Sequence, residues 1–431
     1  MESLYWRSAR RIFESFRRVR LRQLYDSPLR KALPALSFGG NLRLIAGGAT
    51  GGGLAAFMTL GGASAADSVE PAGGNSPTQS TLCRVMLPDD ANPSGNVHGG
   101  TILHLIEQAG WIVATRHCNS NKSSENSGFF SSAKDLSAAL VRVEHMDFIQ
   151  PMYIGEIAQI TANVVFTSER SMEVRVEVWA ENASKGQRRL TNQAILWYVA
   201  VPMDKETSAG HLKSQPVPPL PSNLKLRKEV AAAAKERYEM QKAQRAQAQE
   251  LPGDTKLVAL QPESDAVASS PAASQSSLQH VILPSECFAN SIAQGGVIMK
   301  LMDTLAGVTA ARHCRSPAVV TASLDAIDFH APVLNGNLVT VTGRVTHTSK
   351  RSMEIEVIVF ADNAFTGERK ATNTAYFTFV TLNRLTGKVN EVPQLSTPTD
   401  EDKARFAEGQ QRYDERKEAR KAQKVCGVGQ H

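Results

Sequence analysis

The sequence has few cysteines and little net charge beyond its first residues. Its five cysteines are too few and too scattered for a disulfide framework or a zinc cluster, which makes a reducing compartment the default expectation. The first 43 of the 431 residues hold nine Arg and one Lys against three acidic residues, so the remainder has a net charge of −1 although the whole chain carries +6. A neutral body gives no reason to expect nucleic acid as a partner.

A long uninterrupted hydrophobic run is also missing. Residues 44–66 are apolar and long enough to cross a bilayer, but they include seven Gly, each of which disfavours a helix. We therefore expect no stable membrane span. With 42% hydrophobic and 21% charged residues the composition is that of a globular protein, and the length predicts two or three domains.

The N-terminal segment 1–43 has the composition of a targeting peptide. It is rich in Arg, contains Ser and few acids, and its apolar residues would segregate on one face of a helix. These features predict a mitochondrial transit peptide, with a basic disordered tail as the alternative. Residues 44–80 are predicted to be a Gly/Ala-rich and Ser/Pro linker. If the leader is absent or not functional, we expect the protein in the cytoplasm.

One unit of the sequence occurs twice. Residues 87–110 return as 283–307 at an offset of 196, and an Arg-His-Cys motif follows in both copies. The offset then falls to 181, because the first copy carries about 15 extra polar residues near 121–135 that indicate a surface loop. TSERSMEVRV (167–176) matches TSKRSMEIEV (348–357). Two copies of over 100 residues each are too long for a solenoid and predict tandem domains that fold as an intramolecular pseudo-dimer.

Each copy is predicted to be one long helix followed by several strands. Apolar residues run through 101–114 and 297–311, as in a mostly buried helix. Later segments alternate with period two, so that Val174 lies on the apolar face of a half-buried strand and Glu173 on the opposite, charged face. The pattern predicts an α+β fold in which the helix packs on an antiparallel sheet.

An acidic residue interrupts each apolar helix at the same position, Glu107 in the first copy and Asp303 in the second. Burying an ionised carboxylate is costly unless it is paired, and carboxyl groups with shifted pKa cluster at functional sites. Two glycines start each helix, where amides without an intrahelical partner can donate to a negative oxygen. These are Gly99, Gly100, Gly295 and Gly296. The arrangement indicates an oxyanion-type site suited to acyl transfer.

The loop before the first helix supplies further polar groups. Asn92 and Asn96 in DDANPSGNVHGG are candidates to position water or a carbonyl group by hydrogen bonds, and His98 directly precedes the glycines. The second copy differs. Aligning the prolines at 88 and 284 places Phe288 opposite Asn92, Ile292 opposite Asn96 and Gln294 opposite His98.

Several motifs resemble the hotdog-fold acyl-CoA thioesterases: PDDANPSGNVHGG, the helix containing IEQAG, and then DF, TSERSMEV and LTN. The tandem arrangement, with RHC in both copies, QGGVIMKLMD in the second and RY-containing tails, is similar to the tandem-domain branch of that family. The resemblance covers about residues 82–424. It implies two tandem hotdog domains, each with a long central helix wrapped by an antiparallel sheet.

Four segments follow from this resemblance: hotdog domain 1 (81–203), a linker (204–278), hotdog domain 2 (279–384) and a C-terminal tail (385–431). The linker and the tail each contain a charged helical segment, at 224–250 and 400–424. Because basic and acidic residues nearly balance in both, we expect exposed helices that are solvated or lie between subunits.

The resemblance implies hydrolysis of long-chain acyl-CoA to free fatty acid and CoA without a metal, and without a cofactor because CoA is part of the substrate. The family's catalytic pair is an Asn from the loop of one hotdog and an acid from the helix of the other, which here are Asn92 and Asp303. Asp303 would activate water or attack directly, and Asn92 would hold the water or the carbonyl. The family also implies a homo-oligomer, a trimer of two-domain chains with six hotdogs.

If loop and acid meet across the pseudo-dimer, one composite pocket is complete and the other is degenerate. The complete pocket would combine Asn92 with Asp303, whereas the degenerate one would combine Phe288 with Glu107. We therefore predict one working site per chain.

Two other functions stay open at this point. His98 suggests a His/acid pair of the kind used by an enoyl-CoA hydratase or dehydratase on the same fold, and it pairs with Asp303 in that case. A tandem hotdog that binds acyl-CoA as a non-catalytic sensor is the other alternative.

A few remaining residues have weaker functional interpretations. His117 and His313, in the RHC motifs, are expected to cap and pack at helix ends. Five residues at strand entries are candidate contacts for CoA phosphates, although solvated turn charges explain them equally well. They are Arg170, Ser171, Lys350, Arg351 and Ser352.

Overall fold

The computed structural model describes residues 77–120, 135–203, 213–222, 224, 228–247, 269–288, 291–383 and 385–425. The predicted transit peptide, nearly all of the predicted linker 44–80 and nearly all of the polar insertion near 121–135 lie outside these described residues.

The two copies contain the same elements in the same order. The first copy consists of β1 (Gln79–Val85), η2 (Pro88–Asp90), α2 (Gly99–Cys118), β2 (Leu136–Val143), β3 (Met146–Asp147), β4 (Ile157–Thr167), β5 (Ser171–Glu181) and β6 (Arg188–Pro202). The second consists of β7 (Ser276–Val281), η3 (Pro284–Glu286), α5 (Gly295–Cys314), β8 (Val319–Leu324), β9 (Ile327–Asp328), β10 (Leu338–Thr348), β11 (Met353–Asp362) and β12 (Arg369–Thr381). The further helices are α3 (Lys228–Gln247), α4 (Pro271–Ser274) and α6 (Asp400–Val425).

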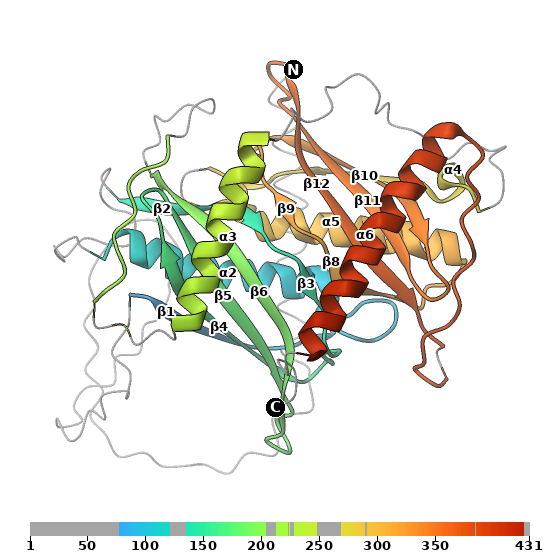
Figure 1. Cartoon of the computed structure of the whole chain (residues 1–431), viewed down its shortest axis with the longest axis horizontal. Helices are drawn as coiled ribbons and strands as arrows, with labels where there is room; N and C mark the ends of the chain where they lie inside the picture. The colour runs from blue at the N-terminus through green and yellow to red at the C-terminus, as the bar shows by residue number, and fades with distance from the viewer. Residues whose placement is uncertain are drawn as a thin grey trace, which may run out of the picture. The chain divides into compact units, whose positions relative to one another are not determined.

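Two antiparallel sheets are built from these strands, in the orders β1-β4-β5-β6-β2-β9 and β3-β8-β12-β11-β10-β7. Each sheet includes one short strand from the other copy, because β9 pairs with β2 and β3 pairs with β8. Arg142 of β2 reinforces this exchange through a 2.6 Å ion pair with Asp328 of β9. The chain is therefore an α+β protein of two tandem hotdog domains that form an intramolecular pseudo-dimer (Figure 1).

The helices α2 and α5 each lie against one sheet and also pack against each other. Their first turns come very close to the partner helix. A Cβ atom added to Gly100 would lie 2.9 Å from the Cα of Lys300, and one added to Gly296 would lie 2.8 Å from the Cα of His104. Only glycine permits this approach, so the Gly-Gly pairs bring the start of each helix to the middle of the other.

The outer face of each sheet is covered by a charged helix. In Figure 1, α3 crosses the first sheet and α6 crosses the second, each on the side away from the central helix. These helices are exposed on one face as expected, but their other face packs on the sheet of their own chain through ion pairs. The face that carries Glu173 is not solvated: Glu173 is fully buried and Arg237 of α3 binds it at 2.6 Å.

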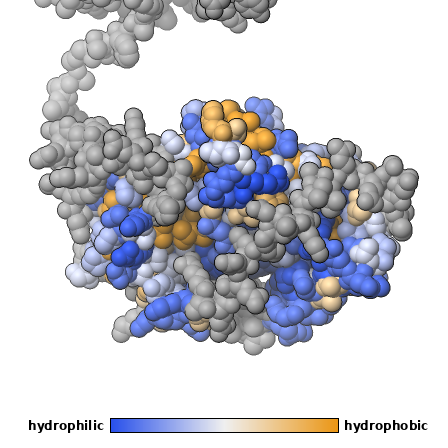
Figure 2. All heavy atoms as spheres, turned by 90° about the horizontal axis from the view of Figure 1, so that it is seen from above, coloured by the Kyte–Doolittle hydropathy of each residue, from blue (hydrophilic) through white to orange (hydrophobic). Residues whose placement is uncertain are grey.

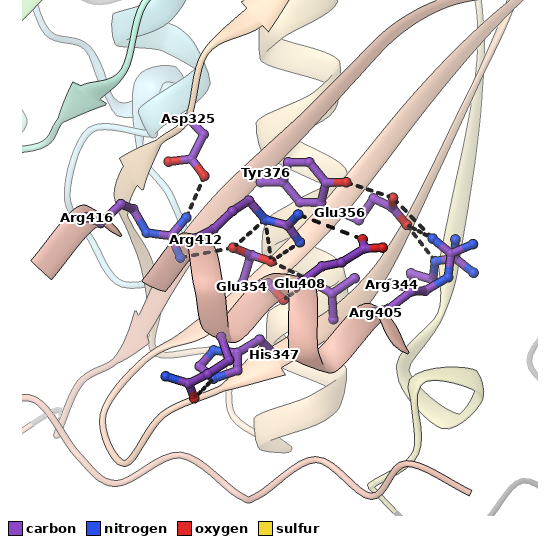
Figure 3. A network of polar contacts seen from close by, with 12 residues as sticks. Asp325, Arg344, His347, Glu354, Glu356, Tyr376, Arg405, Glu408, Arg412 and Arg416 are labelled. Atoms are coloured by element: carbon purple, nitrogen blue, oxygen red, sulfur yellow. Dashed lines mark hydrogen bonds and ion pairs between the residues drawn. The ribbon is translucent and has the colours of Figure 1, made fainter. Parts of the chain in front are cut away.

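The second sheet repeats this arrangement with more partners. Figure 3 shows Arg412 and Arg416 of α6 directed at Glu354 of β11, and both pairs have N–O distances of 2.9 Å. Arg416 also reaches Asp325. A buried carboxylate without such partners would strongly destabilise the fold, so the charged helices are needed to neutralise the acids that lie beneath them.

The histidines of the two RHC motifs anchor the segments that follow each sheet. The Nε2 atom of His117 lies 2.9 Å from the carbonyl oxygen of Pro218, and that of His313 lies 2.8 Å from the carbonyl oxygen of Pro393. The same contact in both copies is consistent with the expected packing role. None of the helices in the described residues is both long and apolar enough to span a membrane.

Candidate active site

Asp303 of α5 lies at the N-terminus of α2, in the other copy. Its Oδ2 accepts a hydrogen bond from the Gly100 amide at 2.6 Å, and its Oδ1 accepts one from the Thr321 hydroxyl of β8 at 2.7 Å. The Nδ1 atom of His98 lies 3.3 Å from Oδ2. The carboxyl group is nearly completely buried, so the first copy supplies a helix N-terminus and a histidine to an acid of the second copy.

The helix-entry glycines hold this acid. A Cβ atom at Gly99 would lie 2.8 Å from Asp303 Oδ2 and 3.0 Å from Thr321 Oγ1, so any side chain there would displace the carboxyl group. The sequence predicts that the helix-entry amides donate to a negative oxygen; in this structure the oxygen at Gly100 belongs to Asp303, and the polarising of a substrate carbonyl by these amides stays a prediction. The Gly100 N–H donates to Asp303, since a carboxylate next to a helix N-terminus is the favourable partner.

The Asn92 loop contacts the region where Asp303 of α5 meets the start of α2, which we call the first junction. The Oδ1 atom of Asn92 accepts hydrogen bonds from the backbone amides of Ser94 (2.9 Å) and Asn96 (3.2 Å), which fixes the loop as an Asx turn. Ser94 in turn donates to the carbonyl oxygen of Pro317, the residue two positions before β8. Because its oxygen is engaged in the loop, the NH2 group of Asn92 is the end that remains for a ligand.

Asn96 contributes backbone rather than side-chain contacts to this loop. Its carbonyl oxygen accepts from the Asn92 amide at 2.7 Å, and its backbone bridges to Tyr153. These contacts shape the turn that carries Asn92, and the same bridge joins the equivalent residues Ile292 and Leu334 in the second copy.

His98 and Thr321 surround the acid more closely than the sequence suggested. His98 is the N-cap of α2, and its Nδ1 accepts from the Gly100 amide at 3.0 Å. Thr321 was missed in the sequence, although the offset of 181 aligns it with Leu140 of the first copy. Thr321 and Leu140 differ as Asn92 and Phe288 do, with a polar residue at the first junction and an apolar one at the second. Comparing the two copies at this position could therefore have identified Thr321.

Burial and polar partners act in opposite directions on Asp303. Burial raises its pKa, while the charge of His98, the Thr321 hydroxyl and the Gly100 amide each lower it, and the net direction is upward. A carboxyl group with a pKa closer to neutral is better matched to accepting a proton from water near pH 7.

The second junction is the equivalent region where Glu107 of α2 meets the start of α5, and it gives the acid a different environment. Glu107 is fully buried, and neither of its carboxyl oxygens has a hydrogen-bond partner among the described residues. Burial raises its pKa to about 8, and the nearby Gly296 amide only partly opposes this rise. Leu140 occupies the place of Thr321, since a Cβ atom on Gly295 would lie 2.6 Å from Leu140 Cδ2. The geometry is therefore that of an apolar junction with a neutral acid.

The five candidate CoA contacts are on turns at the starts of β5 and β11. Ser171 hydrogen-bonds Ser168 at 2.7 Å, and Ser352 does the same with Ser349 at 2.8 Å. Lys350 is largely exposed and pairs with Glu391. The neighbouring Arg170 and Arg351 lie on the same turns and are exposed. These positions remain predictions for phosphate binding.

Within the described residues, no group of three or more His, Cys, Asp or Glu side chains is placed to hold a metal ion.

Comparison with known proteins places the repeat in a family. A family model described as the thioesterase superfamily matches residues 94–186 and 290–364, one region in each copy. The cytosolic acyl coenzyme A thioester hydrolase of Mus musculus is 45% identical over 335 residues, which are 77% of this chain and 82% of that protein. An uncharacterised acyl-CoA thioester hydrolase of Bacillus subtilis is 38% identical over 28% of this chain and 70% of its own length.

Among solved structures, an apo-hexameric acyl-CoA thioesterase is similar, with 33% identity over 35% of this chain and 95% of that chain and a TM-score of 0.33. The two matched regions coincide with the two copies of the repeat, and the mouse relative aligns over most of its length. The chain therefore belongs to the acyl-CoA thioester hydrolase family of the thioesterase superfamily.

Proposed function

We propose that the protein is a thioesterase that hydrolyses long-chain acyl-CoA to a free fatty acid and CoA at one composite site per chain. The observation that carries the proposal is Asp303 of the second copy, hydrogen-bonded to the Gly100 amide of the first copy beside the Asn92 loop. The relatives named above are acyl-CoA thioester hydrolases, which supports the same reaction class.

In the proposed mechanism, Asp303 takes a proton from a water molecule as the water oxygen attacks the thioester carbonyl carbon. The carbonyl oxygen gains negative charge, and the NH2 group of Asn92 donates a hydrogen bond to it. The tetrahedral intermediate then collapses, the carbon–sulfur bond breaks and the CoA sulfur receives the proton. Thr321 and the Gly100 amide hold the carboxylate in place throughout.

The reaction is tested by following thiol release from palmitoyl-CoA with the full-length chain. Replacing Asp303 with Ala is expected to lower kcat about 10²–10⁴-fold, the usual contribution of a general base. Asn92→Ala is expected to lower it about 10²–10³-fold, as for an oxyanion donor. Glu107→Ala is the matched control at the equivalent helix position and should keep most turnover. Equal losses in all three variants would contradict a single working site.

An enoyl-CoA hydratase remains the second candidate because one specific contact favours it. The Nδ1 atom of His98 lies 3.3 Å from Asp303, so a histidine stands beside the acid and pairs with it when Nδ1 carries a proton. Separate incubation with enoyl-CoA and with acyl-CoA distinguishes the two reactions. Loss of the double bond without thiol release would favour the hydratase, and thiol release alone would favour the thioesterase. Tight acyl-CoA binding with neither reaction would favour the sensor.

The proposed reaction requires no cofactor, because the CoA is part of the substrate and the acid, amide and water complete the chemistry. Turnover that survives prolonged dialysis against a chelator supports this expectation, whereas its loss and recovery on adding a metal salt would overturn it.

We also propose a homo-oligomer, with a trimer of two-domain chains as the specific form. Both copies expose an equivalent apolar pair beside an edge strand, and each of these side chains is about half exposed: Val85, Leu87, Val281 and Leu283. Figure 2 shows that hydrophobic patches on one face of the molecule lie among hydrophilic surface. Light scattering should give three times the chain mass, and a monomer would refute the assembly.

For the location, the name of the mouse relative includes the word cytosolic, which favours the cytoplasm for the catalytic part. The mitochondrial prediction has no support from these relatives, and the segment 1–43 on which it depends lies outside the described residues. A fusion of residues 1–66 to a fluorescent reporter tests it, since a diffuse signal would exclude a working transit peptide.

A further inference from the structure

The degenerate junction encloses a cavity that the proposed reaction does not use. Its volume is about 230 Å³, and Glu107 is part of its wall. Most of the remaining wall is apolar, with Leu140 of β2, Phe288 of the loop before α5, Ile298 of α5 and Val333 among the lining residues. The cavity is therefore the counterpart, in the second half of the pseudo-dimer, of the place where Asp303 lies in the first.

The carboxyl group in the wall of this cavity is unpaired. Among the residues that the structure describes, neither carboxyl oxygen of Glu107 has a hydrogen-bond partner; the Oε1 atom of Gln294, the N-cap residue of α5, is also unpaired but lines a second pocket. The Gln294 side chain makes no cap hydrogen bond to the helix, whereas His98 caps α2. Such groups cost stability when they remain unpaired, and in native proteins they mark places where a water or ligand binds.

The first junction shows which chemistry fits a helix start of this kind. There, the Gly100 amide at the N-terminus of α2 holds the Asp303 carboxylate at 2.6 Å. At the second junction Gly296 takes the place of Gly100, but Glu107 is outside hydrogen-bonding geometry with it. A carboxylate supplied by a ligand would complete the same arrangement, because the positive end of the 20-residue helix α5 favours an anion.

Glu107 is a donor toward such a ligand. Burial raises its pKa to about 8, so at neutral pH its carboxyl group keeps a proton and can donate it in a hydrogen bond. A ligand carboxylate would accept from both Glu107 and the amide of Gly295, which is part of the cavity wall at the start of α5. An ester or an alkane of the same length offers no negative oxygen to these two donors.

We propose that this cavity binds a free straight-chain carboxylic acid of about six to eight carbons, with its carboxylate between Glu107 and the amide of Gly295 at the start of α5, and its alkyl chain against Leu140, Phe288 and Ile298. The chain length of the acid follows from the cavity volume. A group the size of a water molecule takes about 30 Å³, so the cavity of about 230 Å³ has room for about eight such groups of the ligand. This site is separate from the proposed catalytic one and does not depend on the reaction assigned there.

The test is calorimetric titration of octanoate into the full-length chain at pH 6.5. We expect one saturable site that Asp303→Asn leaves within threefold of the wild-type affinity. Glu107→Leu removes the donor and should weaken binding at least tenfold, whereas Glu107→Gln keeps an N–H donor and should bind within about fivefold. Methyl octanoate should bind at least tenfold more weakly than octanoate.

Four results would overturn the proposal: no binding to the wild type, loss of binding in Asp303→Asn alone, unchanged binding in Glu107→Leu, or equal binding of the methyl ester. If Glu107→Leu fails to fold, Ala139→Leu, which fills the cavity from β2, replaces it and must also weaken octanoate at least tenfold. Because the readout is binding and not thiol release, a chain that hydrolyses no thioester still gives an interpretable answer.

Discussion

The buried acid at the second junction makes the stability of the fold depend on pH. In the native chain burial raises the pKa of Glu107 to about 8, while an exposed Glu has a pKa near 4.5. Between these values the native state holds a proton that the unfolded chain has released. The free energy of unfolding therefore falls as pH rises through this window, by about 1.4 kcal/mol per pH unit.

Gln does not ionise, so replacing Glu107 with Gln removes this contribution to the pH dependence of the free energy of unfolding and keeps the shape of the side chain. From pH 5 to pH 7 the wild type should lose about 3 kcal/mol that the variant does not lose. Well below pH 4.5 both side chains are neutral in both states, so the two proteins should be similar there, within the roughly 1 kcal/mol expected for exchanging one buried polar group for another. At pH 7 the variant should be the more stable protein.

The measurement is urea unfolding of both proteins at pH 5, 6, 7 and 8, followed by circular dichroism, with the slopes of the transitions compared at each pH. Other titrating groups contribute equally to both proteins and cancel in the difference. A wild-type to variant difference that stays constant from pH 5 to pH 7 would refute the reasoning, because it would mean that Glu107 is already ionised in the native state.

Three further predictions concern the acid and the covering helices. Gly99→Ala should reduce kcat at least tenfold with little change in folding, measured by thiol release and circular dichroism, because its Cβ would lie 2.8 Å from Asp303; unchanged kcat would contradict this contact. Thr321→Ala should move the acidic limb of the kcat–pH profile upward, since the hydroxyl lowers the pKa of Asp303; a downward shift would refute the assignment. Arg237→Met should lower the free energy of urea unfolding by about 3 kcal/mol, because it removes a 2.6 Å partner from buried Glu173, and a loss below 1 kcal/mol would show that the neighbouring charges suffice.

The fold could be predicted because its main signal is the repeat. The offset of 196 through the helix and of 181 through the later strands aligned one copy with the other, and the structure has the same helix and strands in both. The exchange of β3 and β9 between the sheets could not be predicted, since strands of two residues have no periodicity to detect. The burial of Glu173 was missed for a related reason: alternation shows which face is polar, but not which helix covers it.

The candidate site was predictable in part. The acid and the helix-entry glycines were found from position alone, and the structure joins Asp303 to Gly100. The role expected for the Gly100 amide toward a substrate carbonyl stays a prediction, and the sequence could not show that this amide also donates to an acid of the protein itself. Thr321 lies 18 residues beyond Asp303 on a separate strand, so only the folded chain or a comparison of the two copies connects them.

The two copies differ at many positions, and the differences at the two junctions form a consistent set. At four positions the first junction has a polar side chain, a helix cap or the shorter acid, and the second has an apolar side chain, no side-chain cap or the longer acid. The pairs are Asn92 and Phe288, His98 and Gln294, Thr321 and Leu140, and Asp303 and Glu107. Of these groups, His98 and Thr321 lower the pKa of Asp303 and so lower the cost of keeping this buried acid in its charged form. Without such partners the buried Glu107 has its pKa raised to about 8, so its carboxyl group is mostly protonated at neutral pH and is poorly suited to take a proton from water. The missing hydroxyl and histidine at the second junction therefore support the proposal of one working site per chain.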